Sequence, residues 1–139
     1  MEDIILGYDG SDCAKAALAL ATETAKAMGD RVVVVWTIEA HHTGGEVKDY
    51  EDALKEMGER VTAEGAEVAA AAGVETERLL VHGDSPASAL SELADERKAR
   101  VIVVGTHGES PLKGALIGST PHKLIQLART PVLVVPAPS

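Results

Sequence analysis

Four short segments of the chain are apolar at every position, where a half-buried strand would alternate apolar and polar residues. They are residues 4–6 (Ile-Ile-Leu), 32–35 (four Val), 101–104 (Val-Ile-Val-Val) and 132–135 (Val-Leu-Val-Val), and a weaker run, Leu-Leu-Val, occupies 79–81. Continuous runs of this length and composition are typical of strands buried on both faces, as in a parallel sheet. A sheet buried on both faces needs helices on both sides, so these runs predict an α/β fold.

Stretches with helical character separate the apolar runs. We expect helices from Ser11 to about 28, from 46 to about 72, over 86–98 and over 121–128. Gly29 and Gly73 follow the first two stretches, and glycine is the usual residue just past a helix end. The resulting order β-α-β-α-β-α-β-α-β predicts an open parallel sheet with right-handed crossovers, in a single domain over residues 1–139.

The charge and the cysteine content exclude several classes of protein. The formal net charge is −9, whereas nucleic acids and anionic membrane surfaces attract basic patches. Cys13 is the single cysteine, so neither an internal disulfide nor a thiol-metal cluster is expected. The five histidines, including His41 and His42, lack a recognised metal-ligand spacing. With no signal-like or membrane-spanning stretch in the sequence, we expect a cytoplasmic protein that binds neither nucleic acid nor membrane.

The segment after the apolar run 101–104 has the composition of an anion-binding loop. It reads Gly-Thr-His-Gly at 105–108, then nine residues, then Gly118, Ser119, Thr120 and Pro121. Glycines let the backbone approach a ligand closely, serine and threonine are good N-cap residues, and proline suits the first helical position. A helix N-terminus beside a glycine turn binds anions, most often phosphate. The alternative is an ordinary long loop followed by a capped helix.

A carboxylate stands at the end of the first apolar run, in Gly-Tyr-Asp-Gly-Ser at 7–11. Open α/β sheets bind ligands at the carboxyl ends of strands, where the strand order reverses. If the strands at 4–6 and 101–104 are neighbours, Asp9 faces the glycine loop and can accept hydrogen bonds from a ribose hydroxyl or a base N–H. The alternative is that Asp9 caps the first helix together with Ser11.

Other nucleotide and catalytic signatures are absent from the sequence. It has neither the P-loop pattern Gly-x4-Gly-Lys-Ser/Thr nor the dinucleotide pattern Gly-x-Gly-x2-Gly. It also lacks a Gly-x-Ser-x-Gly nucleophile elbow and a Ser-His-acid order. We therefore do not expect a dedicated enzyme, although slow hydrolysis through a water near Ser119 stays open.

Three motifs together resemble the universal stress protein family, in particular its ATP-binding branch. That branch carries Gly-x2-Gly-x9-Gly-Ser/Thr, matched here by Gly105, Gly108, Gly118 and Ser119. The opening Ile-Leu-Gly-Tyr-Asp-Gly-Ser and the closing Thr-Pro-Val-Leu-Val-Val-Pro at 130–136 are similar as well. The resemblance covers essentially the whole chain.

This resemblance implies a Rossmann-like sheet of the adenine nucleotide alpha hydrolase type, with five parallel strands in the order 3-2-1-4-5 and helices on both faces. It implies that Asp9 holds the ribose and that the backbone near Thr37 meets the adenine. Of the remaining predicted site residues, Gly105, Thr106 and Gly108 would line the ribose and the phosphates. Gly118, Ser119 and Thr120 would hold the phosphates by backbone N–H groups and hydroxyls. The ligand would be ATP, ADP or AMP, with Mg²⁺ or Mn²⁺ carried on the phosphates.

The resemblance also implies a homodimer through the strand Val132–Val135. Pro131 and Pro136 leave open that this strand is instead an unpaired edge. The implied function is a nucleotide-dependent regulator in stress response, read by a protein partner that the sequence does not identify. A dimeric interaction module that binds no nucleotide and a slow ATPase or phosphotransferase are the alternatives.

The sequence departs from the family pattern around the phosphates. Pro121 replaces a common second hydroxyl residue and lacks an N–H, while Thr120 occupies an often apolar position. Glu109, Pro111 and Lys113 lie in the loop, where basic or glycine residues are frequent. These changes leave the preferred nucleotide open. His107 is expected to contact either phosphate or solvent, and Trp36 to lie near the adenine.

Overall fold

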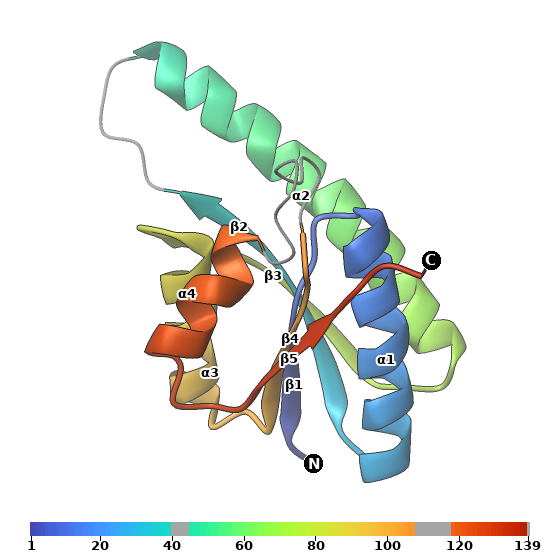
Figure 1. Ribbon diagram of the computed structural model, residues 1–139. Coiled ribbons are helices and arrows are strands. Elements are labelled where there is room, and N and C mark those ends of the chain that lie inside the picture. Colours follow the sequence, from blue (N-terminus) through green and yellow to red (C-terminus); the bar gives the residue numbers. More distant parts are fainter. Residues whose placement is uncertain (40–44, 108–117, 139) are drawn as a thin grey trace.

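The computed structural model describes residues 1–39, 45–107 and 118–138 (Figure 1). Strands and helices alternate along the chain, as the apolar runs predict. In chain order the elements are β1 (Asp3–Gly7), α1 (Asp12–Met28), β2 (Arg31–Glu39), α2 (Gly45–Ala71), β3 (Thr76–Gly83), α3 (Pro86–Arg97), β4 (Val101–Gly105), α4 (Ser119–Leu127) and β5 (Val132–Val135).

All neighbouring strands of the sheet are parallel, and their order is β3-β2-β1-β4-β5. The expected order 3-2-1-4-5 is confirmed. Within this sheet, Ile4 of β1 pairs with Val32 of β2 on one side and with Val101 of β4 on the other. The strand order therefore reverses between β1 and β4, which places the carboxyl ends of these two strands side by side.

Each face of the sheet is covered by its own helices, with α1 and α2 on one side and α3 and α4 on the other (Figure 1). Ile4 and Leu6 of β1 belong to the core beneath α1, together with Leu18. Ile5 belongs to the core beneath α3, together with Leu90. Because successive side chains of a strand point to opposite faces, two covered faces require apolar residues at every position. This explains the continuous apolar runs.

The start and end of α1 follow the sequence signals. The Ser11 hydroxyl accepts a hydrogen bond from the backbone N–H of Ala14 at 3.2 Å, so Ser11 is the N-cap. Gly29 ends the helix with a left-handed φ of 72°, and Gly73 has a φ of 85° just after α2. These positive φ values explain why both helices end at glycine.

Two boundaries differ from expectation. The strand expected at 79–81 is longer, Thr76–Gly83, because it pairs with β2 along its entire length. The fourth helix begins at Ser119, its N-cap is Gly118, and neither Ser119 nor Thr120 caps it through a side chain. The assignment of Pro121 to the first helical position is therefore wrong. Proline is tolerated as the third residue because N–H groups in the first turn lack intrahelical partners.

At the amino ends of the strands, charged side chains form a partly buried network. The Asp30 carboxylate, which is 1% exposed, accepts hydrogen bonds from the Arg100 guanidinium and from the backbone N–H of Glu2 at 3.0 Å. The hydrogen bond from Arg100 is the main reason that the pKa of Asp30 lies below its ordinary value, although burial opposes the shift. This network therefore lies at the opposite end of the strands from Gly105 and Asp9. Within the described ranges, none of the helices is both long and apolar enough to cross a membrane.

Candidate functional site

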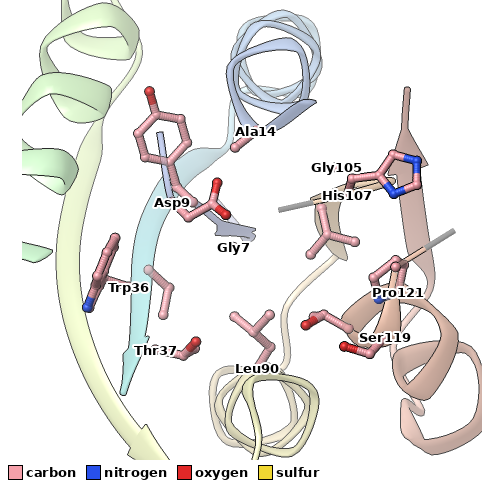
Figure 2. A pocket seen from close by; sticks show the side chains of 15 residues that line it. Gly7, Asp9, Ala14, Trp36, Thr37, Leu90, Gly105, His107, Ser119 and Pro121 are labelled. Atoms are coloured by element: carbon pink, nitrogen blue, oxygen red, sulfur yellow. The ribbon is translucent and has the colours of Figure 1, made fainter. Parts of the chain in front are cut away.

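A pocket of about 340 Å³ lies at the carboxyl ends of β1, β2 and β4 (Figure 2). It sits where the strand order reverses, which is the usual ligand position in open α/β sheets. Its walls come from β2 itself, from the ends of β1 and β4 and the turns after them, from α1 and α3, and from the N-terminus of α4. The lining residues are Gly7, Tyr8, Asp9, Ala14, Val35, Trp36, Thr37, Leu90, Val104, Gly105, His107, Gly118, Ser119, Thr120 and Pro121.

Asp9 forms one wall of this pocket and also fixes the turn into α1. Its Oδ1 accepts a hydrogen bond from the Ser11 backbone N–H at 3.0 Å, and Gly10 completes the turn with a φ of 81°. Figure 2 shows the Asp9 side chain across the pocket from Ser119. The two interpretations of Asp9 are therefore compatible, because Oδ1 orders the turn and the carboxylate still lines the pocket.

The N-terminus of α4 forms the opposite wall. The Gly118 N–H donates to the Thr106 carbonyl oxygen at 2.5 Å, and a Cβ on Gly118 would lie 3.1 Å from that oxygen. The first backbone bond of the helix runs from the His122 N–H to the Gly118 oxygen at 3.3 Å. Ser119 and Thr120 therefore present backbone N–H groups without an intrahelical partner, at the positive end of the helix dipole. This wall has the chemistry of an anion site.

Gly105 lines the pocket, and the close packing of α1 behind it leaves no room for a side chain at this position. A Cβ at this position would lie 2.6 Å from Cys13 Cβ and 2.8 Å from the Cys13 carbonyl carbon. The end of β4 therefore rests directly on the first turn of α1. The predicted role of Gly105 in lining ribose and phosphate is compatible with this second role.

Thr106 is directed toward α1 and β5, and it is not among the lining residues. Its Oγ1 lies 3.4 Å from Cys13 Sγ, and its N–H donates to the Val135 carbonyl oxygen at 3.0 Å. The hydrogen bond from Thr106 lowers the pKa of the buried Cys13 thiol, burial opposes this, and backbone N–H groups including that of His107 add to the lowering. Thr106 thus supports the wall from behind.

At the other end of the pocket, two aromatic side chains pack against glycines of α2. Trp36 packs on Gly58, where a Cβ would lie 2.5 Å from the indole Cδ1, and its Nε1 is buried without a hydrogen-bond partner among the described residues. Tyr8 packs on Gly65, where a Cβ would lie 2.9 Å from the ring Cε2. The sequence analysis did not predict this packing. The signal that could have revealed it is the pair Gly58 and Gly65, seven residues apart inside the helix.

The structure brings most of the predicted site residues to one pocket. Those that line it are Asp9, Thr37, Gly105, Gly118, Ser119 and Thr120, and Thr106 stands directly behind. Gly108 lies outside the described residues, as do Glu109, Pro111, Lys113 and the histidine pair at 41–42. The sequence did not single out Tyr8, Ala14 or Leu90 as part of the site. Leu90 and Ala14 carried no signal, because they are ordinary apolar residues of their helices.

His107 belongs to the pocket wall, and its Nδ1 atom is buried without a hydrogen-bond partner in the described part of the chain. Figure 2 shows its ring on the same side of the pocket as Pro121 and Ser119.

The charges around the pocket are few. Among the lining residues that the structure describes, Asp9 is the one carboxylate, and neither lysine nor arginine occurs. In the described ranges, no group of three or more His, Cys, Asp or Glu side chains is placed to hold a metal ion. In the described part of the wall, the groups that suit an anion are backbone N–H groups, hydroxyls and the positive end of the helix dipole.

Comparison with known proteins agrees with this architecture. The model of the Universal stress protein family matches residues 1–136. A universal stress protein of Thermus aquaticus is 39% identical over 138 residues, which cover 95% of this chain and 96% of that protein. A solved family structure from Burkholderia pseudomallei has a TM-score of 0.82 at 32% identity and covers 98% of this chain and 96% of its own. A universal stress protein solved in complex with cAMP has a TM-score of 0.79 at 29% identity, covering 99% and 98% of the two chains. The chain belongs to the universal stress protein family.

Proposed function

We propose that this protein binds an adenine nucleotide in the pocket and uses it as a regulatory ligand in a cytoplasmic stress response. The observation that carries the proposal is the placement of Asp9 and the N-terminus of α4 on opposite walls of one pocket. A carboxylate suits the hydroxyls of a ribose, and a helix N-terminus suits a phosphate. The distance between them is bridged by one nucleotide that lies across the ends of β1 and β4.

The apolar and aromatic end of the pocket suits the base. Trp36, Thr37 and Val35 follow one another along β2 at this end, and Leu90 approaches from α3. Such a lining is typical of small-molecule sites, where apolar surface supplies affinity and a few polar groups fix the orientation. A relative solved in complex with cAMP supports an adenine nucleotide as the ligand.

A divalent ion such as Mg²⁺ or Mn²⁺ would arrive on the phosphates, because the described residues supply no ligand cluster of their own. We propose a binding function with at most slow hydrolysis, since Asp9 is the one carboxylate able to activate water among the lining residues of the described ranges. We further propose that β5, the last strand of the sheet, pairs with its copy in a homodimer. Val132, Leu133 and Val134 are only partly buried, as expected of an edge that receives another chain.

The binding proposal is tested by calorimetric titration of nucleotide-free protein with AMP. The Asp9→Asn variant keeps an acceptor for the Ser11 N–H but loses the charge, so the turn stays and the ribose contact weakens. We expect a loss of about tenfold in affinity, the size of one hydrogen bond to a charged group. Asp84→Asn, an exposed residue outside the pocket, is the matched control and should bind like the unchanged protein. Equal affinity of the two variants would contradict the proposed site.

A further inference from the structure

The first part of α2 projects beyond the sheet and packs little against it. Figure 1 shows this end of the helix extending past the carboxyl ends of the strands. From Lys48 to Met57 no residue is buried, whereas Gly58, on which Trp36 packs, is buried, as are Thr62 and Ala69 further along. Most of the stability of a helix in a protein comes from the packing of an apolar face. The segment 48–57 would therefore gain stability from a molecule that covers it.

Apolar side chains of α2 recur at the spacing of a helix-helix contact. The intervals between successive positions alternate between four and three residues, which is the repeat of coiled-coil helices. This row of side chains, here called the α2 stripe, consists of Tyr50, Leu54, Met57, Val61, Glu64 and Val68. Met57 is 43% exposed and Val68 is 53% exposed. A helix with a matching apolar row has the shape that fits this surface.

The α2 stripe lies on the side of the helix that faces α1. Val61 packs against the core beneath α1, and a Cβ on Gly10, in the turn before α1, would lie 3.5 Å from Val61 Cγ1. Positions that are three, four or seven residues apart share one face of a helix, so Met57 and Val68 lie on this side as well. One row of side chains therefore passes from contacts within the chain into solvent.

Acidic side chains predominate around the α2 stripe. Residues 48–68 include seven carboxylates and three basic side chains. Glu64 stands in the stripe itself and forms no ion pair within the described part of the chain. Burial raises the pKa of the nearby Tyr8 hydroxyl, and the carboxylates of Glu64 and Asp9 add to this. A helix that covers the stripe would bury the Glu64 carboxylate, and a buried carboxylate needs a cationic partner.

The same carboxylate disfavours a second copy of this chain on the α2 stripe. In a parallel pair of α2 helices Glu64 would face Glu64 of the other copy, and in an antiparallel pair centred on the stripe it would face Leu54. Either arrangement would bury a carboxylate without a cation, which is costly. An anionic membrane surface or a nucleic acid would be repelled by the excess of carboxylates.

We propose that the α2 stripe is a docking surface for a basic amphipathic helix of another protein. The apolar side chains of that helix would pack among Leu54, Met57, Val61 and Val68, and a lysine or arginine would pair with Glu64. The pocket lining that the structure describes includes no residue of α2, so this surface is separate from the proposed nucleotide site. The proposal therefore goes beyond the proposed function and stands or falls independently of it.

The probe for this surface is a synthetic peptide of about three heptads, with leucine at the a and d positions and lysine elsewhere. Calorimetric titration of the full chain at physiological salt should give a dissociation constant in the micromolar range. Met57→Gln removes the apolar contact and keeps a good helix former, so it should weaken binding by at least about tenfold. Met28→Gln, at a similarly exposed methionine at the end of α1, is the matched control and should change the affinity by less than about twofold.

Glu64→Gln tests the contribution of charge at one position of the stripe. It should weaken binding of the peptide by about fivefold, because the cation opposite Glu64 loses its partner. Glu67→Gln makes the same change in net charge at an exposed position of the same helix outside the stripe, and it should weaken binding by less than about twofold. Equal effects of the two substitutions would contradict the role assigned to Glu64.

Three results would overturn the proposal as a whole. The first is failure of the peptide to bind, or equal affinity of Met57→Gln and Met28→Gln. The second is a change in the oligomeric state of the peptide-free protein on Met57→Gln, measured by sedimentation, because it would assign the stripe to a second copy. The third is a set of peptide-induced shifts of backbone amide signals that is largest outside residues 54–68, a measurement that needs no variant. All the variants should bind AMP like the unchanged protein, which separates these outcomes from misfolding and from failure of the proposed function.

Discussion

Replacing Gly105 by alanine tests whether this motif glycine is held by packing, independently of any ligand. The added Cβ would meet Cys13 Cβ at 2.6 Å, the Cys13 carbonyl carbon at 2.8 Å and its oxygen at 3.0 Å. Two of these atoms are backbone in the first turn of α1 and cannot rotate away. The end of β4 and the start of α1 must therefore separate.

The cost of this separation follows from the contacts. Overpacking in a well-packed interior typically costs 1–3 kcal/mol, and a clash with backbone belongs to the upper end, so we expect Gly105→Ala to lower the free energy of unfolding by about 3 kcal/mol. For a chain of 139 residues the unfolding entropy is about 0.3 kcal/mol/K, so the melting temperature should fall by about 10 °C. Gly118→Ala is the comparison, because its Cβ meets one carbonyl oxygen at 3.1 Å and its φ is −73°. That variant should lose about 1 kcal/mol or less.

The assay is urea denaturation followed by far-UV circular dichroism, with the free energy of unfolding in water and the slope compared among variants. A second substitution, Cys13→Gly, tests the source of the clash. It removes Cys13 Cβ, the nearest atom, and keeps the contact with the Cys13 carbonyl carbon. Cys13→Gly should therefore recover only part of the loss caused by Gly105→Ala. A Gly105→Ala protein within about 0.5 kcal/mol of the unchanged protein would refute the packing role.

Two further predictions concern pH. The pKa of Asp30 is lowered in the folded protein, chiefly by Arg100, so its contribution to stability is present above the ordinary aspartate range and is lost as the pH falls through the lowered pKa. Asp30→Asn should lower the free energy of unfolding by about 2 kcal/mol at neutral pH and by progressively less in acid. Glu75→Gln, at an exposed position, is the control and should change this free energy little. A difference between Asp30→Asn and the unchanged protein that stays constant with pH in urea titrations would contradict the prediction. The hydrogen bond with Thr106 is the largest cause of the lowered pKa of Cys13. When the alkylation rate of Cys13 is measured against pH, Thr106→Val should therefore move the midpoint of the curve to higher pH. Since Cys13 is the single cysteine, iodoacetamide reports on it alone, and an unmoved midpoint would count against the contact.

The fold could be predicted from the sequence wherever the burial of a segment determines its local composition. Residues 4–6, 32–35 and 102–104 are buried on both faces of the sheet, and the continuous apolar character of these runs predicted the parallel sheet. β3 lies at an edge of the sheet and includes Thr, Glu, Arg and His, so its composition predicted only its centre. The start of α4 depends on a hydrogen bond from Gly118 to Thr106, which no local cap preference reveals.

The polar part of the site and Trp36 were predictable from the sequence, and the rest of the apolar part was not. Asp9 and the glycines stand at strand ends, where the chain needs special residues to turn, and that requirement is visible in sequence. Leu90 and Ala14 reach the pocket because of the way α3 and α1 cross the sheet, which depends on packing between distant residues. The contact of Trp36 with Gly58 likewise joins positions that only the folded chain brings together.

The central claim is that one adenine nucleotide lies across the pocket from Asp9 to the N-terminus of α4. A crystal structure of the protein with AMP tests it most directly. The account predicts density for the ribose beside Asp9, for the phosphoryl group at the N–H groups of Ser119 and Thr120, and for the adenine near Thr37. A nucleotide bound elsewhere, or one bound in this pocket with its phosphate beside Asp9, would contradict the account.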